Sequence, residues 1–194
     1  MLKEYYKNTV LPAMVKEHGY KNVMSVPKIE KVVVNVGFGR EAAKTTGEAR
    51  RKVMDMISTD LATITGQKIL FTKARKSIAG FKIRDGLIIG AKVTLRRQMM
   101  WDFLERLIFI ALPRTRDFRG LDLGKIDQNG NLNIGMKEQT VFPEIIQEKE
   151  KQVFGLQITV CTTAKTRKDG INLFRAMNFP LKKEEETTKK KNKK

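Results

Sequence analysis

The sequence predicts an α+β fold, in which helices pack on one face of a mostly antiparallel β-sheet. Strand-like and helix-like segments are mixed along the chain without the regular strand–helix–strand alternation of a parallel sheet. The 194 residues are enough for one domain with a substantial core or for two very small ones, and hydrophobic residues make up 41% of them. We therefore expect a single layered domain.

The first two predicted elements are a helix at residues 4–17 and a strand at residues 29–36. Apolar side chains recur at helical spacing through the first segment, and Pro12 is expected to kink it or to end its first half. The second segment, IEKVVVNV, is rich in β-branched residues and is bounded by Pro27 and Gly37. That composition and punctuation are typical of a strand.

A long helix, two strands and a loop are predicted next. Apolar residues recur every three or four positions in residues 47–64, and Gly66 can end this helix. Strands at residues 68–73 and 87–96 flank the segment ARKSIAGFKIRDG (74–86). The glycines and charges of that segment are typical of an exposed loop or a loose hairpin.

The second half of the chain is predicted to contain a core helix at residues 98–112. Apolar residues cover most of its circumference, which indicates a central position. These residues are Trp101, Phe103, Leu104, Leu107, Ile108 and Ala111. Residues 113–150 are predicted to be irregular, apart from a short strand near 132–135. A strand at 155–163 and a last helix at 169–177 complete the fold.

The composition limits the partners and the compartment. The formal net charge is +18, and a polyanion such as nucleic acid or an anionic membrane surface would relieve the self-repulsion. Cys161 is the only cysteine, so no internal disulfide can form. The N-terminus has no apolar run of the signal-peptide type, and the longest apolar stretch is Leu107 to Pro113. We expect a cytoplasmic protein that does not cross a membrane.

The densest basic block lies between Lys68 and Arg97. Nine basic residues and a single acid, Asp85, give a net charge of +8 there. Lysine and arginine displace counterions from phosphates, and an exposed phenylalanine such as Phe81 can stack on a base. A solubilising loop is the alternative interpretation. The Lys-rich tail, residues 183–194, is predicted to be disordered and is weaker evidence for RNA binding.

Several short motifs resemble catalytic or ligand sites but lack required residues. Residues 37–42 (GFGREA) fit a relaxed dinucleotide fingerprint, yet the next predicted strand ends in Thr72-Lys73 without the acid that holds the ribose. A dinucleotide-dependent oxidoreductase is therefore an alternative, and a glycine-lined turn that brings strand and helix together is the better interpretation. The segment 120–125 is one residue too short for a phosphate-binding P-loop.

No metal site or cofactor is predicted. Residues 127–138 carry oxygen ligands at calcium-loop spacing, but Leu132 stands where that loop requires glycine. His18 and Cys161 are the only histidine and cysteine, too few for a structural zinc site. His18 is expected near a helix cap, and Cys161 is expected to be a small buried residue. The carboxylates form no pattern typical of general acid–base catalysis, so we expect a protein that is not an enzyme.

Five segments, in order, resemble one family closely. They are TGQKILFTKARKSIAGFKIRDG (65–86), IGAKVTLR (89–96), ALPRTRDFRGL (111–121), NGNLNIGMKEQTVFPEI (129–145) and NFPLKK (178–183). Through these segments the chain resembles the bacterial large-subunit ribosomal protein five, the binder of 5S ribosomal RNA. The similarity runs from about Tyr5 to Lys182.

The resemblance implies a curved antiparallel sheet with helices on one side, within a single RNA-binding domain at residues 1–182. It implies a place in the central protuberance, bound to 5S and 23S rRNA, to neighbouring large-subunit proteins and to a small-subunit head protein. No small-molecule substrate and no membrane partner are implied. A mobile basic loop at about 73–84 is expected to contact the tRNA in the peptidyl site. Its contact residues would be Lys73, Ala74, Arg75, Lys76, Ser77, Ile78, Ala79, Gly80, Phe81, Lys82 and Arg84.

Three neutral residues match family contacts to 5S rRNA: Asn35, Gln67 and Thr94. Each can donate to or accept from a sugar or a base edge. The neighbouring cations Lys92, Arg96 and Arg97 would contact phosphates. Seen without the resemblance, each neutral residue would be an ordinary strand-end or turn residue.

Overall fold

The computed structural model describes residues 1–20, 22–116, 118–145 and 153–182. The chain forms two compact units. Among the described residues, unit 1 comprises 1–20, 22–32, 96–116, 118–134 and 159–182, and unit 2 comprises 33–95, 135–145 and 153–158. The tail predicted to be disordered, residues 183–194, lies outside the described residues. The expectation of one domain over residues 1–182 stays a prediction.

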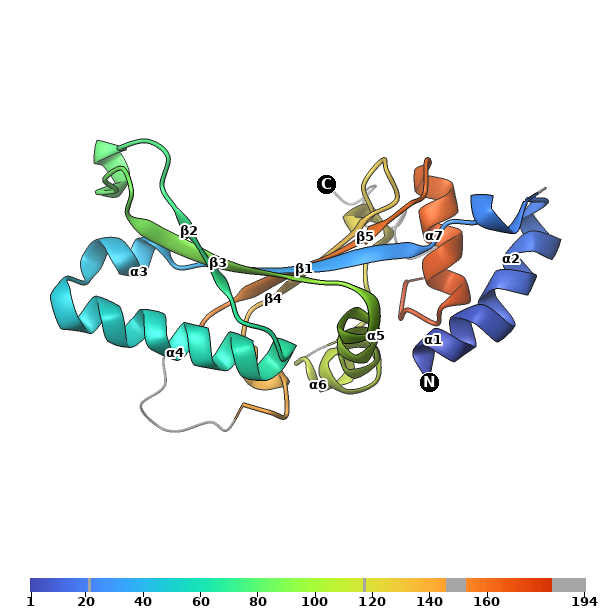
Figure 1. Ribbon diagram of the computed structural model, residues 1–194, viewed down its shortest axis with the longest axis horizontal. Helices are drawn as coiled ribbons and strands as arrows, with labels where there is room; N and C mark the ends of the chain where they lie inside the picture. The colour runs from blue at the N-terminus through green and yellow to red at the C-terminus, as the bar shows by residue number, and fades with distance from the viewer. Residues whose placement is uncertain (21, 117, 146–152, 183–194) are drawn as a thin grey trace. The chain divides into compact units, whose positions relative to one another are not determined.

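Five strands form an antiparallel sheet, which confirms the predicted α+β class (Figure 1). In spatial order they are β2 (Leu70–Lys73), β3 (Ile88–Leu95), β1 (Ile29–Gly37), β5 (Leu156–Thr162) and β4 (Leu132–Met136). The predicted strand positions are confirmed to within about two residues at each end. In each of β1, β3, β4 and β5 buried and more exposed residues alternate over most of the length, because one face of the sheet carries the core and the other is open.

In unit 2, α3 (Gly39–Lys44) and α4 (Gly47–Thr65) cover the buried face of β3 (Figure 1). Helix α4 buries Ile57, Leu61 and Ile64, which are spaced along one of its faces. It ends at Gly66, whose φ of 70° is the left-handed conformation that glycine adopts at helix ends. The helix predicted at residues 47–64 is thus confirmed, whereas the short helix α3 was not predicted.

The helices of unit 1 are two long runs and one shorter helix. The first run joins α1 (Leu2–Tyr5), a π-helical turn (Tyr6–Val10) and α2 (Leu11–His18); the second joins α5 (Arg97–Arg106), a π-helical turn (Leu107–Ala111) and α6 (Leu112–Arg114). Helix α7 (Arg167–Ala176) packs beside α2, and α1 packs on α5. The side chains predicted to make the second run a core helix are all buried.

The π-helical turns explain how both runs accept an internal proline. Leu11 and Leu112, the residues just before Pro12 and Pro113, each donate a backbone hydrogen bond to the carbonyl five residues earlier. A proline in a regular helix would clash with the carbonyl four residues earlier, and a widened turn relieves that clash. Of the two expectations for Pro12, a kink or an end of the first half, the second was therefore wrong, because the run continues to His18.

Short 3-10 turns complete the described structure, at Val23–Ser25, Ala79–Phe81, Leu123–Lys125 and Gln139–Val141. Among the described residues, no helix is both long and apolar enough to span a bilayer.

Candidate nucleic-acid interface

The open face of the sheet in unit 2 presents three of the predicted contact residues. On β1, Asn35 is exposed between the buried Val34 and Val36. On the neighbouring β3, Lys92 is exposed and Thr94 is half-buried, while Ala91 and Val93 face the core. Because side chains alternate along a strand, Asn35, Lys92 and Thr94 lie on the face that the helices leave uncovered.

Gln67 lies in the turn between α4 and β2, where its backbone is held in place. The Thr65 hydroxyl donates to the Gln67 carbonyl at 3.2 Å and accepts from the Gln67 N–H at 3.4 Å. The Gln67 side chain is exposed. Within the described part of the chain, the side chains of Asn35, Gln67 and Thr94 make no hydrogen bond. They are therefore available to an outside partner.

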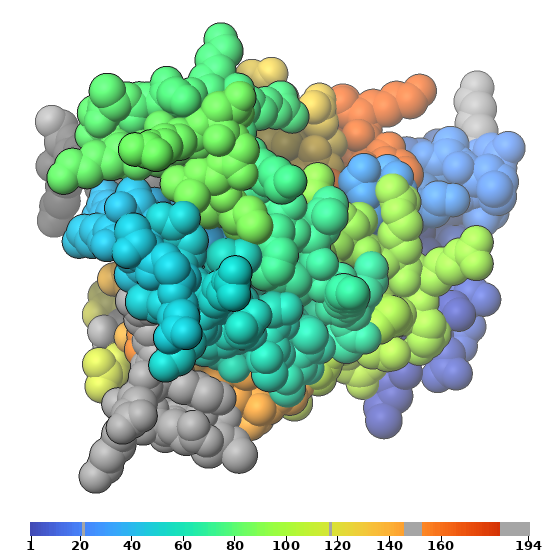
Figure 2. All heavy atoms as spheres, turned by 60° about the vertical axis from the view of Figure 1, so that its left-hand side comes forward, coloured from blue at the N-terminus to red at the C-terminus, as the bar shows by residue number. Residues whose placement is uncertain are grey.

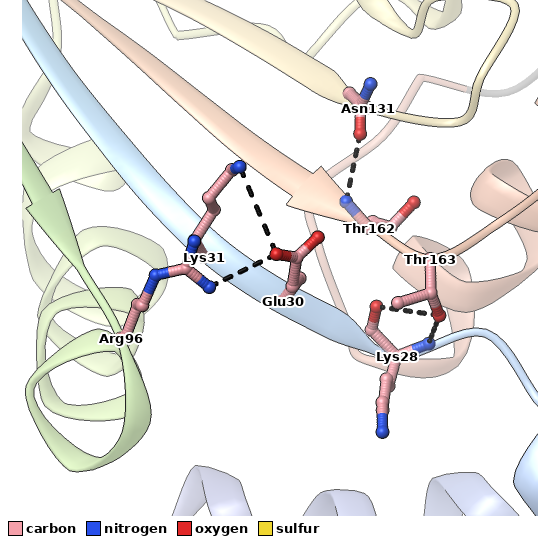
Figure 3. A network of polar contacts seen from close by, with 7 residues as sticks. All are labelled: Lys28, Glu30, Lys31, Arg96, Asn131, Thr162 and Thr163. Carbon is pink, nitrogen blue, oxygen red and sulfur yellow. Dashed lines mark hydrogen bonds and ion pairs between the residues drawn. The ribbon is translucent and has the colours of Figure 1, made fainter.

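Arg96 and Arg97 follow β3 and belong to unit 1. The Arg96 guanidinium donates to the Glu30 carboxylate at 3.1 Å, and the Lys31 ammonium lies 4.0 Å from the same oxygen (Figure 3). Arg97 is exposed and has a φ of 54°, a left-handed conformation that is unusual for arginine. Sequence reasoning missed Glu30 and Lys31, because ion pairs between β1 and the end of β3 depend on strand pairing.

Polar side chains fix the ends of β1, β4 and β5 in unit 1 (Figure 3). The Thr162 N–H donates to the Asn131 side chain at 2.9 Å, and the Lys28 N–H donates to the Thr163 hydroxyl at 3.0 Å. Asn131 in turn donates twice to the Asp127 carboxylate. Asp127 therefore holds a turn, as the polar-turn interpretation of residues 127–138 predicted.

Cys161 is half-exposed on the open face of β5, between the buried Val160 and Thr162. The expectation that it is buried was wrong, because strand alternation turns it away from the core. Desolvation raises the pKa of its thiol, Glu30 and Asp127 add to this, and Lys31 and Arg96 act in the opposite direction. A thiol with a raised pKa stays protonated at neutral pH and is a poor nucleophile.

His18 is the last residue of α2, but the helix is capped by Gly19. The Gly19 N–H donates to the Val15 carbonyl at 3.2 Å, with a φ of 66° at Gly19. The His18 ring instead lies 3.4 Å from the Asn172 amide nitrogen. No group of three or more potential metal ligands occurs in the part of the chain that the structure describes.

The basic loop of unit 2 is a closed hairpin. At its base, the Ala74 N–H donates to the Leu87 carbonyl and the Gly86 N–H donates to the Ala74 carbonyl. Near its tip, Ile78 and Ile83 exchange two backbone hydrogen bonds around the 3-10 turn. Among the residues predicted to contact tRNA, Ala74 is buried, so its side chain is not available to a partner. The other ten are exposed, with Phe81 at 70%.

The dinucleotide-like segment is a packing turn. A Cβ on Gly39 would lie 3.3 Å from the Ile89 Cβ, and the Phe38 N–H donates to the Ile89 carbonyl at 3.0 Å. The second glycine therefore lets α3 lie against β3. The turn interpretation predicted a close approach of strand and helix at these glycines, although it did not predict this short helix. The dinucleotide interpretation is not supported, because the strands of this sheet are antiparallel.

Comparison with known proteins covers nearly the whole chain. Residues 22–84 match the family model of ribosomal protein L5, and residues 88–181 match the model of the C-terminus of the same ribosomal family. The large ribosomal subunit protein uL5 of Marinomonas sp. (strain MWYL1) is 49% identical over 182 residues, which cover 94% of this chain and 98% of that protein. The resemblance noted in the sequence is confirmed: the chain belongs to the ribosomal protein L5 (uL5) family and is a ribosomal structural protein, not an enzyme.

Proposed function

We propose that this protein is a structural constituent of the cytoplasmic large ribosomal subunit that binds 5S rRNA through the open face of its sheet. The observation that carries the proposal is that the side chains of Asn35, Gln67 and Thr94 make no hydrogen bond within the described residues, and that Lys92 is exposed on the same sheet face. Neutral donors and acceptors read sugars and base edges, and cations hold phosphates. The similarity to a large-subunit protein supports the same assignment.

The wider set of partners belongs to the same proposal. The protein contacts 23S rRNA and neighbouring large-subunit proteins in the central protuberance, and it helps to bridge to a protein of the small-subunit head. The basic loop at about 73–84 is mobile and contacts the tRNA in the peptidyl site. Its closed base and exposed, cationic tip support this role, because the tip can reach a second RNA without disturbing the sheet face.

A gel shift with 5S rRNA against an unrelated RNA of equal length, at physiological salt, tests the proposal. The triple variant Asn35→Ala, Gln67→Ala, Thr94→Ala should lose 5S rRNA binding. A matched control exists in Asn8→Ala, Thr9→Ala, Gln128→Ala, which removes the same three side-chain types from exposed positions off the sheet. Equal binding by both triple variants would refute the sheet-face assignment.

Deletion of Ala74–Lys82 separates the two RNA contacts. It should leave 5S rRNA binding in place and weaken tRNA binding in the peptidyl site of reconstituted ribosomes. Loss of 5S rRNA binding on this deletion would contradict the division of roles. Binding of 5S rRNA should also weaken with salt, with a slope near −4 for about six phosphate contacts at roughly 0.7 each.

A further inference from the structure

A hollow in unit 2 lies between the tip of the basic loop and helix α3. Its volume is about 590 Å³, and its walls come from the two segments in equal number: Gly39, Arg40, Ala43 and Lys44 on α3, and Gly80, Phe81, Lys82 and Ile83 on the loop. Figure 2 shows the loop, in green, directly above the start of α3, in blue. Pockets of roughly 300–1,000 Å³ are typical of sites that bind a small molecule or cofactor.

Helix α3 is oriented so that its cations face the loop. The close approach of Gly39 to Ile89 fixes the start of the helix on β3, and Ala42 is buried. Residues 40 and 44 lie one turn apart, so Arg40 and Lys44 share the opposite face. On the loop side, Lys82 has a φ of 53° and closes the 3-10 turn that carries Phe81.

The charges in this hollow are of one sign. In the described residues, no carboxylate lies within ion-pair distance of Arg40, Lys44 or Lys82, and all three side chains are exposed. Three uncompensated cations around one hollow repel one another, and a phosphate between them removes that repulsion. Phe81 is 70% exposed, so its ring is accessible for stacking on a flat partner such as a base.

We propose that this hollow binds one unstacked nucleotide of single-stranded RNA. The base stacks on Phe81, and its phosphates lie among Arg40, Lys44 and Lys82. Ala43 and Gly80 are small and leave room for a flat ring; a Cβ on Gly80 would meet no atom within 4 Å. Combined cation and aromatic contacts of this kind hold RNA without reading its sequence. The inference rests on the proposed role of the loop in RNA contact, and it adds α3 to that surface.

Fluorescence anisotropy of the full-length protein with a labelled single-stranded hexaribonucleotide tests the inference. The double variant Arg40→Gln, Lys44→Gln should bind about tenfold more weakly than the control Arg51→Gln, Lys52→Gln, which removes two exposed cations from α4. Equal weakening in both variants would show that only overall charge matters and would overturn the proposal.

The stacking contact is tested by Phe81→Leu, which keeps an apolar side chain but removes the ring. This variant should bind the hexanucleotide about tenfold more weakly and should no longer prefer it to an abasic oligomer of the same length. Unchanged binding would exclude a base site. The proposal would also be overturned if the protein bound anionic phospholipid vesicles as tightly as the hexanucleotide and lost this binding in the Arg40→Gln, Lys44→Gln variant. The hollow would then select only negative charge.

Failure of this proposal can be distinguished from failure of the proposed function. Both α3 and α4 double variants should bind 5S rRNA as the unchanged protein does, and thermal unfolding should show that both are folded. A protein that fails to bind 5S rRNA, yet binds the hexanucleotide in an α3-dependent way, would refute the proposed function and retain the hollow. A protein that binds 5S rRNA but binds the hexanucleotide without dependence on α3 would refute the nucleotide site alone.

Discussion

Gly170 on α7 and Gly130 before β4 touch through their backbones: a Cβ on Gly170 would lie 2.5 Å from the Gly130 Cα. Gly170→Ala should therefore destabilise the protein by about 1–3 kcal/mol, because backbone atoms cannot move aside as a flexible side chain can. Helix propensity alone would predict a gain of up to about 1 kcal/mol from the same change. Urea unfolding followed by circular dichroism measures whether the free energy of unfolding falls or rises on this substitution.

Gly124→Ala is the matched control for Gly170→Ala. A Cβ on Gly124 would meet no atom within 4 Å, and its φ is not positive. Its free energy of unfolding should change by less than about 0.5 kcal/mol. If Gly170→Ala were as stable as this control, the close contact would not limit the packing of α7.

Arg97 combines a strained backbone with an exposed charge. For a residue other than glycine, a left-handed conformation costs roughly 1–2 kcal/mol. Arg97→Gly should therefore raise the free energy of unfolding by about 1 kcal/mol. If Arg97 holds one phosphate of 5S rRNA, as expected, this change should also weaken 5S rRNA binding and reduce the salt slope by about 0.7. Urea unfolding and a salt titration of binding measure the two effects.

Arg97→Lys separates charge from backbone strain. It keeps the cation and the strain, so both its stability and its salt slope should stay near those of the unchanged protein. A gain in stability by Arg97→Gly without any change in RNA binding would mean that the strain serves no contact with RNA.

The Glu30 carboxylate, near the start of β1, lies within ion-pair distance of both Arg96 and Lys31 (Figure 3). Glu30→Gln should tighten 5S rRNA binding, lowering the dissociation constant roughly two- to fivefold, because it removes a negative charge beside Arg96, a proposed phosphate contact. Stability should change by less than about 1 kcal/mol, since the Arg96 and Glu30 side chains are 51% and 45% exposed.

Glu17→Gln changes the net charge equally from an exposed position on α2 and should leave binding nearly unchanged. Weaker binding by Glu30→Gln would give Glu30 a different role: its carboxylate would then position the Arg96 guanidinium for the phosphate.

Much of the fold could be predicted from local patterns. The alternation of Val32, Val34 and Val36 identifies β1, and Gly66 identifies the end of α4, because each pattern reflects one element in its own surroundings. The π-helical turns could not be predicted, since each is an adjustment of a helix that continues through a proline. Cys161 was misplaced because its neighbours Val160 and Thr162, not its own residue type, decide which face of β5 it occupies.

The candidate site was predictable only in part. The charge density between Lys68 and Arg97 is visible in the sequence and identifies the loop. Arg40 and Lys44 lie outside that block and join it only because Gly39 brings α3 against β3. Such a contact depends on tertiary packing, which no short segment of the sequence encodes by itself.

Tyr20 ties the segment after α2 to the start of α7. Its hydroxyl donates to the Asp169 carboxylate at 3.0 Å, and desolvation, this hydrogen bond and the carboxylate charge raise the Tyr20 pKa to about 12. The unfolded chain loses this proton near pH 10. The stabilisation is therefore complete below pH 10 and is lost as the pH rises toward 12.

Tyr20→Phe removes both the hydrogen bond and its pH dependence. It should be less stable than the unchanged protein at pH 8, and the difference in free energy of unfolding should shrink steadily between pH 10 and 12. Taking the difference between the two proteins cancels the titration of the many lysines, which both share. Urea unfolding at matched pH values provides the measurement. A difference that stays constant from pH 8 to 12 would mean that the Tyr20 hydroxyl titrates alike in the folded and unfolded chains.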